Sequence, residues 1–247
     1  MENSIYLALS RQLVLRTNMD MISNNIANMN TSGYRGQNML FEEYLSDPNG
    51  KTIDRGANDE LSFVYDRGQY QTTTQGSLRF SGNPLDVALE GPGFFGVQGP
   101  GDEVMYSRNG QFQLGTDGSL LTSAGFAVAG QGGGAITIPE GSTEIKIDRN
   151  GVVSNQDGQV GQLMVVEFEN IQELEPVGNN LYSSPEPGTP QQESRVLQYQ
   201  LEGSNVQPIV EMTRMIETLR SYQSTQRVLQ TENERLRSAI QKLTGQS

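Results

Sequence analysis

The sequence contains no cysteine, no histidine and no tryptophan in 247 residues. Without cysteine, the chain has neither disulfides nor thiolate metal sites. Without histidine, it lacks the commonest zinc ligand and the usual general base, so every Ser-His-Asp or Cys-His arrangement is excluded. The lack of tryptophan removes the best platform for stacking against a sugar. These absences exclude much of enzyme chemistry.

Basic residues and long apolar runs are also scarce. The chain has 17 basic and 29 acidic residues, a net charge of −12, which disfavours a nucleic-acid partner. No apolar run approaches the roughly 20 residues of a membrane span, so we expect a protein that does not span a membrane. The opening "MENSIYLALSRQ" has an acidic residue where a signal peptide needs basic ones. If the protein leaves the cytoplasm, we expect export without a cleaved Sec signal.

Both ends of the sequence show heptad spacing, which predicts helices over residues 1–33 and 201–247. The seam of the first consists of Met1, Ile5, Ala8, Gln12, Leu15, Met19, Ile22, Ile26 and Met29. The seam of the second consists of Met212, Met215, Leu219, Tyr222, Gln226, Leu229, Asn233, Leu236, Ile240 and Leu243. Gly33 is suited to end the first helix, and Ser204 or Asn205 to cap the second. Two such helices, if paired, form a long antiparallel coiled-coil stalk; ordinary amphipathic helices lying on a core remain the alternative.

The middle of the sequence has a different pattern. Residues 34–67 include the polar passage "SDPNGKTIDRGANDE" and are predicted to be an extended linker. Residues 68–200 consist of short β-type runs separated by glycine, including two passages in which Asn-Gly precedes Asp-Gly by seven or eight residues. The fold class is therefore predicted to be α+β, a mainly β middle domain with long terminal helices. Its core candidates are Phe94, Phe95, Phe112 and Phe126.

Two motifs have enzymatic interpretations that the sequence does not favour. "GPGFFG" at residues 91–96 matches the dinucleotide pattern, but no helix pattern follows it to bind a phosphate. Neighbouring acids could form a glycosidase pair, although solvated faces explain them more simply. These acids are Glu42 and Glu43, Asp102 and Glu103, and Glu167 and Glu169.

The first helix carries an unusual number of asparagines. We interpret Asn18, Asn24, Asn25, Asn28 and Asn30 as a face that is buried against neighbouring molecules, because amides need no charge to be desolvated. A helix end that simply frays is the alternative. Apolar residues outside the seams are expected to stay exposed on the two helices and to mark interaction surfaces: Leu9, Leu13, Ile209, Val210 and Ile216.

Three stretches resemble the signatures of bacterial flagellar rod and hook proteins, the axial-protein family. They are "NNIANMNTSGYRG", "NPLDVALEGPGFFGV" and "LEGSNVQPIVEMTRMIETLRSYQ", and the resemblance covers nearly the whole chain. Within the family, "ENSIYLALSRQ" and "AITIPEGSTEIKIDRNG" are most similar to the proximal-rod type. Gly36 departs from the pattern, since many relatives have a longer side chain there.

The resemblance implies a structural subunit of the basal-body rod that is exported by the flagellar type III apparatus. Its terminal helices would polymerise into the drive-shaft that transmits torque across the periplasm, and its partners would be itself and other proximal and distal rod subunits. No catalytic residue, cofactor, metal, small-molecule substrate or nucleic acid is implied. The subunit-interface candidates are Ile5, Leu9, Leu15, Met19, Ile22, Asn24, Asn25, Ile26, Asn28, Met29, Gly33, Tyr34, Asn205, Met212, Met215, Ile216, Leu219, Tyr222, Leu229, Leu236 and Ile240.

Other functions stay open at this point. A distal-rod or hook-type subunit would share the same signatures. A carbohydrate-active enzyme on a β scaffold would need an acid pair roughly 5 to 9.5 Å apart in a cleft. An adhesin-like binding module would be expected to form a stable closed trimer.

Overall fold

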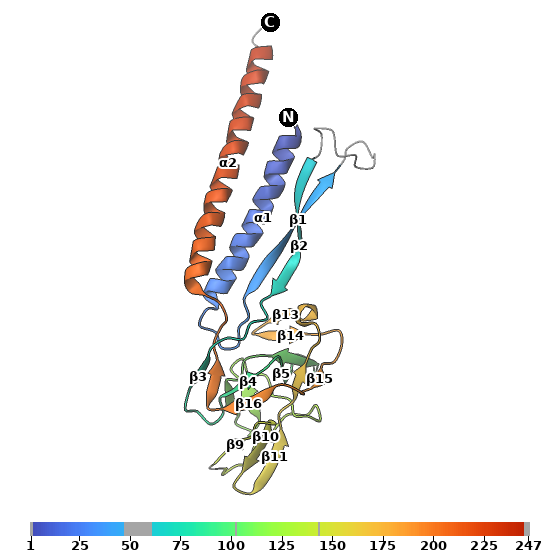
Figure 1. The fold of residues 1–247 in the computed structure, drawn as a ribbon, viewed down its shortest axis with the longest axis vertical. Helices are drawn as coiled ribbons and strands as arrows, with labels where there is room; N and C mark the ends of the chain where they lie inside the picture. The colour runs from blue at the N-terminus through green and yellow to red at the C-terminus, as the bar shows by residue number, and fades with distance from the viewer. Residues whose placement is uncertain (1, 47–60, 102, 143, 245–247) are drawn as a thin grey trace. The chain divides into compact units, whose positions relative to one another are not determined.

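The computed structural model describes residues 2–46, 61–101, 103–142 and 144–244. The fold is mainly β, with one helix near each end of the chain. The chain divides into two compact units (Figure 1). Unit 1 consists of residues 1–27, 37–70 and 207–247, and unit 2 of residues 28–36 and 71–206.

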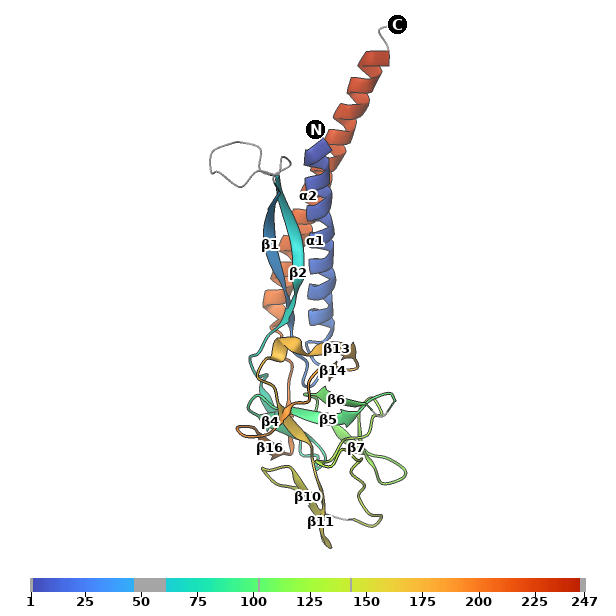
Figure 2. The ribbon, with the colours of Figure 1, turned by 90° about the vertical axis from the view of Figure 1, so that its right-hand side faces the viewer.

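Unit 1 contains two helices and a two-stranded sheet. The helices are α1 (Glu2–Ala27) and α2 (Pro208–Thr244), and the strands are β1 (Gln37–Ser46) and β2 (Leu61–Gln71). The helices lie side by side and run in opposite directions (Figures 1 and 2). At 1.5 Å per residue, α1 is roughly 39 Å long and α2 roughly 56 Å.

The buried face of α2 overlaps the predicted seam only in part, because Met215, Tyr222, Leu229 and Leu236 of that seam are half-buried. Its buried residues are Glu211, Thr218 and Thr225, which are spaced by seven, whereas Met212 and Leu219 of the predicted seam are exposed. The small side chains of Thr218 and Thr225 allow α1 to approach closely, and Glu211 accepts a hydrogen bond from Asn25 of α1. The helix pair therefore does not bury a continuous apolar coiled-coil seam along α2.

The boundaries predicted from the sequence also require correction. Helix α1 ends at Ala27 rather than residue 33, and α2 begins at Pro208 rather than residue 201. The first backbone bond of α2 runs from the Glu211 amide to the Gln207 carbonyl, so neither Ser204 nor Asn205 is its cap. The predicted linker over 34–67 contains strand β1 and part of β2; residues 47–60 of the polar passage lie outside the described residues.

Unit 2 is built from short antiparallel strands. The largest sheet has the order β13-β14-β6-β5-β12-β15, and the smaller sheets are β11-β10-β9, β16-β4, β17-β3 and β7-β8. The strands are β3 (Leu78–Phe80), β4 (Val87–Glu90), β5 (Phe94–Gln98), β6 (Val104–Ser107), β7 (Phe112–Leu114), β8 (Leu120–Thr122), β9 (Lys146–Ile147), β10 (Val152–Asn155), β11 (Gly158–Gln162), β12 (Val165–Glu167), β13 (Glu175–Gly178), β14 (Leu181–Ser183), β15 (Thr189–Pro190), β16 (Arg195–Gln198) and β17 (Gln200–Glu202). A 3-10 helix, η1 (Ile171–Glu173), precedes β13.

The glycine-containing turns lie where the sequence predicts them. Asp117-Gly118 joins β7 to β8, and Asp157-Gly158 joins β10 to β11. The "GPGFFG" passage leads into strand β5, which agrees with the absence of a helix pattern after it.

The predicted aromatic core is confirmed in its location but divides into separate clusters. Phe95 and Phe112 belong to the largest cluster, with ring centroids 5.3 Å apart. Phe94 belongs to a second cluster with Tyr106 and Tyr182, and Phe126 packs at the margin of a third. Because the neighbours Phe94 and Phe95 point to opposite faces of β5, one strand contributes to two clusters.

Candidate interaction sites

The asparagine-rich stretch of residues 22–36 is divided between the two units. Its first part completes α1 in unit 1, and residues 28–36 belong to unit 2. The buried members of the stretch are Ile22, Asn25 and the consecutive residues 33–36. These residues therefore contact their own chain rather than solvent.

Asn25 connects three elements of unit 1. Its side-chain oxygen accepts from the Gln37 amide at 3.0 Å, and its nitrogen donates to the Gln37 carbonyl at 2.8 Å. The same nitrogen lies 3.3 Å from Oε2 of Glu211 in α2. Asn25 is only 2% exposed, so its side chain packs within its own chain. Its amide is satisfied inside the subunit.

Glu211 is the acceptor at the centre of this contact. Its other carboxylate oxygen, Oε1, accepts from Arg214 at 2.9 Å, and Arg214 also donates to the Asn38 side chain at 2.8 Å. Burying this carboxylate is tolerable because charged and amide donors pair with both oxygens. The first turn of α2 is thereby fixed to α1 and to the start of β1.

Gly33 and Tyr34 are buried within unit 2. The Gly33 amide donates to the Glu202 carbonyl at 2.8 Å, and its φ of 69° is in the left-handed region. A Cβ at this position would lie 2.5 Å from the carbonyl carbon of Arg108. Only glycine suits both the conformation and the space.

Asn205 holds together three segments of unit 2. Its oxygen accepts from the Gly36 amide at 2.7 Å, and its nitrogen donates to the carbonyls of Thr72 and Thr74 at 3.2 and 2.8 Å. Its backbone amide donates to the Tyr34 carbonyl at 3.3 Å. Like Asn25, it connects segments of its own subunit, and it is half-buried.

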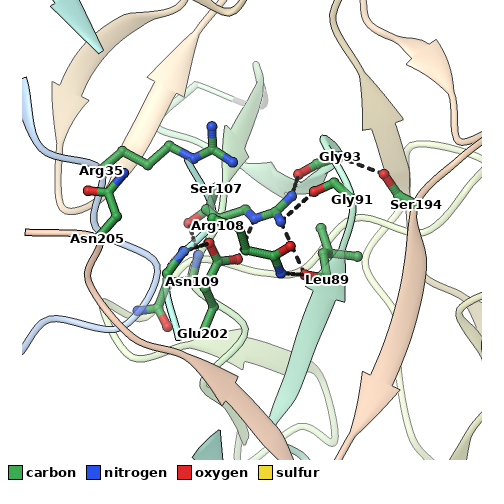
Figure 3. A network of polar contacts seen from close by, with 12 residues as sticks. Arg35, Leu89, Gly91, Gly93, Ser107, Arg108, Asn109, Ser194, Glu202 and Asn205 are labelled. Atoms are coloured by element: carbon green, nitrogen blue, oxygen red, sulfur yellow. Dashed lines mark hydrogen bonds and ion pairs between the residues drawn. The ribbon is translucent and has the colours of Figure 1, made fainter. Parts of the chain in front are cut away.

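A buried ion pair lies close to these segments. Nε of Arg108 contacts Oε2 of Glu202 at 2.5 Å, and both side chains are almost fully buried (Figure 3). Arg108 also donates to the carbonyls of Leu89, Gly91 and Gly93. Oε1 of Glu202 accepts from the Gly76 amide at 3.1 Å. The pair therefore fixes the loop before β5 to strand β17.

Arg35 brings a second guanidinium into the same region. It lies over the Phe94 ring at 5.2 Å and donates to the Thr73 carbonyl at 3.4 Å. Burial lowers the pKa of Arg35, as does the charge of Arg108, while Glu202 acts in the opposite direction. Burial also raises the pKa of Tyr182, which Arg35 partly offsets. Sequence reasoning missed Arg108 and Glu202, because no local pattern distinguishes a buried charge from a solvated one.

The other predicted interface residues differ in exposure. Exposed residues are Leu9, Asn24, Met212, Ile216, Leu219 and Ile240. Half-buried residues are Leu15, Met19, Ile26, Asn28, Met29, Met215, Tyr222, Leu229 and Leu236. Ile22 is buried, and the side chain of Ile5 lies outside the described residues. The exposed apolar residues predicted outside the seams, including Leu13, Ile209 and Val210, are confirmed as exposed.

The exposed apolar residues form a stripe on each helix. The α1 stripe consists of Tyr6, Leu9 and Leu13, and the α2 stripe of Ile209, Met212, Ile216 and Leu219. Both follow spacings of three and four residues, as the contact positions of packed helices do. An apolar stripe that the described residues of its own chain leave uncovered is typical of an interaction surface.

Two kinds of feature, a metal-binding group and a membrane-spanning helix, are absent from the described residues. No group of three or more histidine, cysteine, aspartate or glutamate side chains that could hold a metal occurs among them. No helix in the described part of the chain is long and apolar enough to cross a membrane.

Three family descriptions match this chain. "Flagella basal body rod protein" matches residues 5–35, "Flagellar hook protein FlgE/F/G D1 domain" matches residues 88–155, and "Flagellar basal body rod FlgEFG protein C-terminal" matches residues 197–242. The first contains Asn25, the second Arg108 and the third both Glu202 and Glu211. The matched regions thus include the connecting residues of both units.

Whole-chain relatives carry related names. The "Flagellar basal-body rod protein FlgF" of Caulobacter vibrioides is 36% identical over 98% of this chain and 98% of its own length. The protein of the same name from Mesorhizobium japonicum is 30% identical over 100% of both chains. The "Flagellar basal-body rod protein FlgG" of Caulobacter vibrioides is 32% identical over 95% of this chain and 97% of its own length.

Proposed function

The chain belongs to the flagellar basal-body rod proteins, of the FlgF type, and we propose that it polymerises into the rod through its two terminal helices. It is a structural subunit of the rod and is located in the flagellar basal body. As a member of this family it interacts with other components of the rod. The observation that carries the polymerisation proposal is the pair of exposed apolar stripes on α1 and α2.

Two different surfaces on one subunit are what an open assembly requires. When one surface binds a different surface on the next subunit, the contact repeats without closing and generates a helical polymer. Packed helices then transmit torque from subunit to subunit. Assembly also explains why α2 has exposed apolar residues in the isolated subunit, because neighbouring subunits would cover them in the rod.

The finer arrangement is part of the proposal. The terminal segments 1–33 and 201–247 would build the inner tube, and their helices would complete an antiparallel coiled-coil stalk when neighbours pack against them. The β-rich residues 68–200 would face outward, with 34–67 connecting the parts. Of the interface candidates, the exposed and half-buried residues of the helices would form the contacts, whereas Asn25, Gly33, Tyr34 and Asn205 would keep each subunit in the shape that the contacts require.

The place in the rod and the route to it are inferred from the resemblance and the relatives. Whole-length similarity to FlgF proteins supports a position in the proximal rod, with proximal and distal rod subunits as neighbours. Within one organism the FlgF relative matches better than the FlgG relative, which disfavours a distal-rod subunit. Export by the flagellar type III apparatus, a periplasmic location and the absence of catalysis are proposed on the same basis.

Removing residues 229–247 tests the role of α2. The truncation deletes Leu229, Leu236 and Ile240 and leaves unit 2 intact. We expect the isolated truncated protein to keep its thermal transition within about 3 °C, since the deleted segment has few buried side chains. In cells that lack the native protein, the truncated chain should be absent from purified basal bodies, whereas the full chain enters them. Entry of the truncated chain would contradict the proposal.

A further inference from the structure

The largest sheet of unit 2 ends on both sides in a strand that contains a proline. In the order β13-β14-β6-β5-β12-β15, the outer strands are β13, with Pro176, and β15, with Pro190. Every residue of these two strands is exposed. The four strands between them contain no proline. In this sheet, as far as the described strands show, proline therefore occurs only at the edges, where an unpaired backbone could accept a further strand.

Pro190 removes a hydrogen-bond donor from the open edge of β15. The Gln191 amide donates to the Val165 carbonyl at 3.1 Å, which directs the backbone of Gln191 towards β12. Backbone groups of successive residues in a strand point to opposite sides, so the nitrogen of Pro190 is directed away from β12. That nitrogen carries no hydrogen. The edge therefore has no N–H at the position where an incoming strand would accept its hydrogen bond.

At the opposite edge, β13 combines its proline with an irregular backbone. Pro176 lies opposite Tyr182 of β14, and the register shifts between Pro176 and Gly178, so that Val177 is an extra residue in the strand. Val177 is 55% exposed and has the β-branched side chain that favours strand pairing. A missing N–H and a bulge beside this apolar side chain disrupt the regular backbone that a further strand would need.

We propose that Pro176 and Pro190 prevent the largest sheet of unit 2 from pairing edge to edge with a second copy of this chain. The interior strands β5 and β12 carry aromatic and β-branched residues, which form strands readily, so the prolines protect a sheet that would otherwise be easy to extend. This protection concerns unit 2 alone. Its benefit rests on the proposed function, because copies held side by side in a rod meet at a high effective concentration.

The double variant Pro176→Val/Pro190→Val tests the proposal, because it gives each edge an N–H and a β-branched side chain. The measurements are sedimentation velocity of the purified full chain and the infrared amide band of intermolecular β-sheet. We expect the associated fraction to be at least about fivefold larger than for the native chain at the same concentration. The matched control is Pro185→Val/Pro187→Val, which makes the same two changes at exposed prolines outside the strands and should behave like the native chain.

A third variant, Pro176→Lys/Pro190→Lys, separates open edges from a damaged fold. It removes the same two prolines but places a charge at each edge, which hinders pairing of strands, so it should associate no more than the native chain. The proposal would be overturned if the valine variant associated no more than the native chain. It would also be overturned if the lysine variant or the loop control associated as strongly as the valine variant. None of these outcomes bears on the proposed function, which entry into basal bodies tests separately.

Discussion

The side chain of Asn25 pairs with both backbone groups of Gln37, so an amide at the end of α1 takes the place of a neighbouring strand at the start of β1. Nine residues lie between Ala27, where α1 ends, and Gln37, where β1 begins. The two hydrogen bonds fix the separation of the helix and the strand although the chain between them belongs to the other unit. The same amide contacts Glu211, so the start of α2 is positioned by the same residue.

Replacing Asn25 by alanine should destabilise unit 1 by about 1 to 3 kcal/mol, because buried polar groups lose their partner. The measurement is urea unfolding followed by circular dichroism at 222 nm, which reports the helices. Ser23→Ala is the matched control, since Ser23 is exposed on the same helix, and it should change stability by less than about 0.5 kcal/mol. Equal losses in the two variants would contradict the connecting role of Asn25.

The asparagines show how far the sequence could predict the site. It indicated that amides on α1 are placed for burial, and burial is what Asn25 undergoes. It could not indicate the partners, because an amide pairs equally well with a neighbouring molecule or with its own chain. Gln37 and Glu211 lie 12 and 186 residues away along the chain, and only the fold brings them to Asn25.

Breaking the buried ion pair should be far more damaging than breaking an exposed one. Arg108→Met leaves Glu202 buried without its partner, and we expect a loss of about 3 to 5 kcal/mol. Arg235→Met is the control, because Arg235 pairs with Glu232 at 2.8 Å on the exposed surface of α2 and should cost less than about 1 kcal/mol. Chemical denaturation of both variants checks this. A loss below about 1 kcal/mol for Arg108→Met would show that the pair does not stabilise unit 2.

The fold was predictable where local chemistry decides it. Asp-Gly turns and alternating β-type runs indicated the hairpins of unit 2, and heptad spacing indicated both helices. The strand β1 was missed because its sequence, "QNMLFEEYLS", leads directly into a polar, turn-rich passage whose composition dominated the interpretation. The face of α2 that is buried was predicted only in part, for another reason. Heptad spacing holds both for its apolar residues and for Glu211, Thr218 and Thr225, and the pattern cannot indicate which face is buried.

Gly33→Ala should lower the free energy of unfolding of unit 2 by more than an alanine in the left-handed backbone conformation usually does. The new Cβ would lie 2.5 Å from the Arg108 backbone in addition to requiring a φ of 69°. Gly133→Ala separates the two effects, because Gly133 has a φ of 81° but open space around its Cβ position. We expect about 1 kcal/mol for Gly133→Ala and at least twice that for Gly33→Ala, measured by thermal unfolding. Similar values would show that unit 2 relaxes around residue 33.

Acid should weaken the segment before β16 through Glu167. Partial burial would raise the pKa of Glu167, but hydrogen bonds from Ser194, Gln192 and Glu193 outweigh it and lower the pKa below its usual range. Oε1 of Glu167 accepts from all three backbone amides at 2.8 to 3.0 Å. The folded state therefore prefers the ionised carboxylate.

The sign of the pH effect follows from this preference. The stabilisation is fully present above the pKa of the unfolded chain, about 4.3, and is lost as the pH falls through the lower pKa of the folded state. Thermal unfolding between pH 6 and 3 should show a smaller decline for Glu167→Gln than for the native chain. The two declines would be parallel if Glu167 contributed nothing.

Ile216→Glu should leave the isolated protein intact and prevent its incorporation into the rod. Ile216 is 52% exposed, so a carboxylate there remains in water in the monomer, and surface substitutions of this kind usually change stability by less than about 0.5 kcal/mol. In the assembled rod the same carboxylate would lie against the apolar residues of a neighbour without a cation to pair with it. Gln223→Glu adds the same charge seven residues further along the same face of α2, beyond the α2 stripe, and should enter rods normally. The measurements are the melting temperature of each purified variant and its abundance in basal bodies from cells that lack the native protein. Normal abundance of Ile216→Glu would show that the α2 stripe stays exposed in the rod, and reduced abundance of both variants would indicate that added charge, rather than its position on the stripe, hinders assembly.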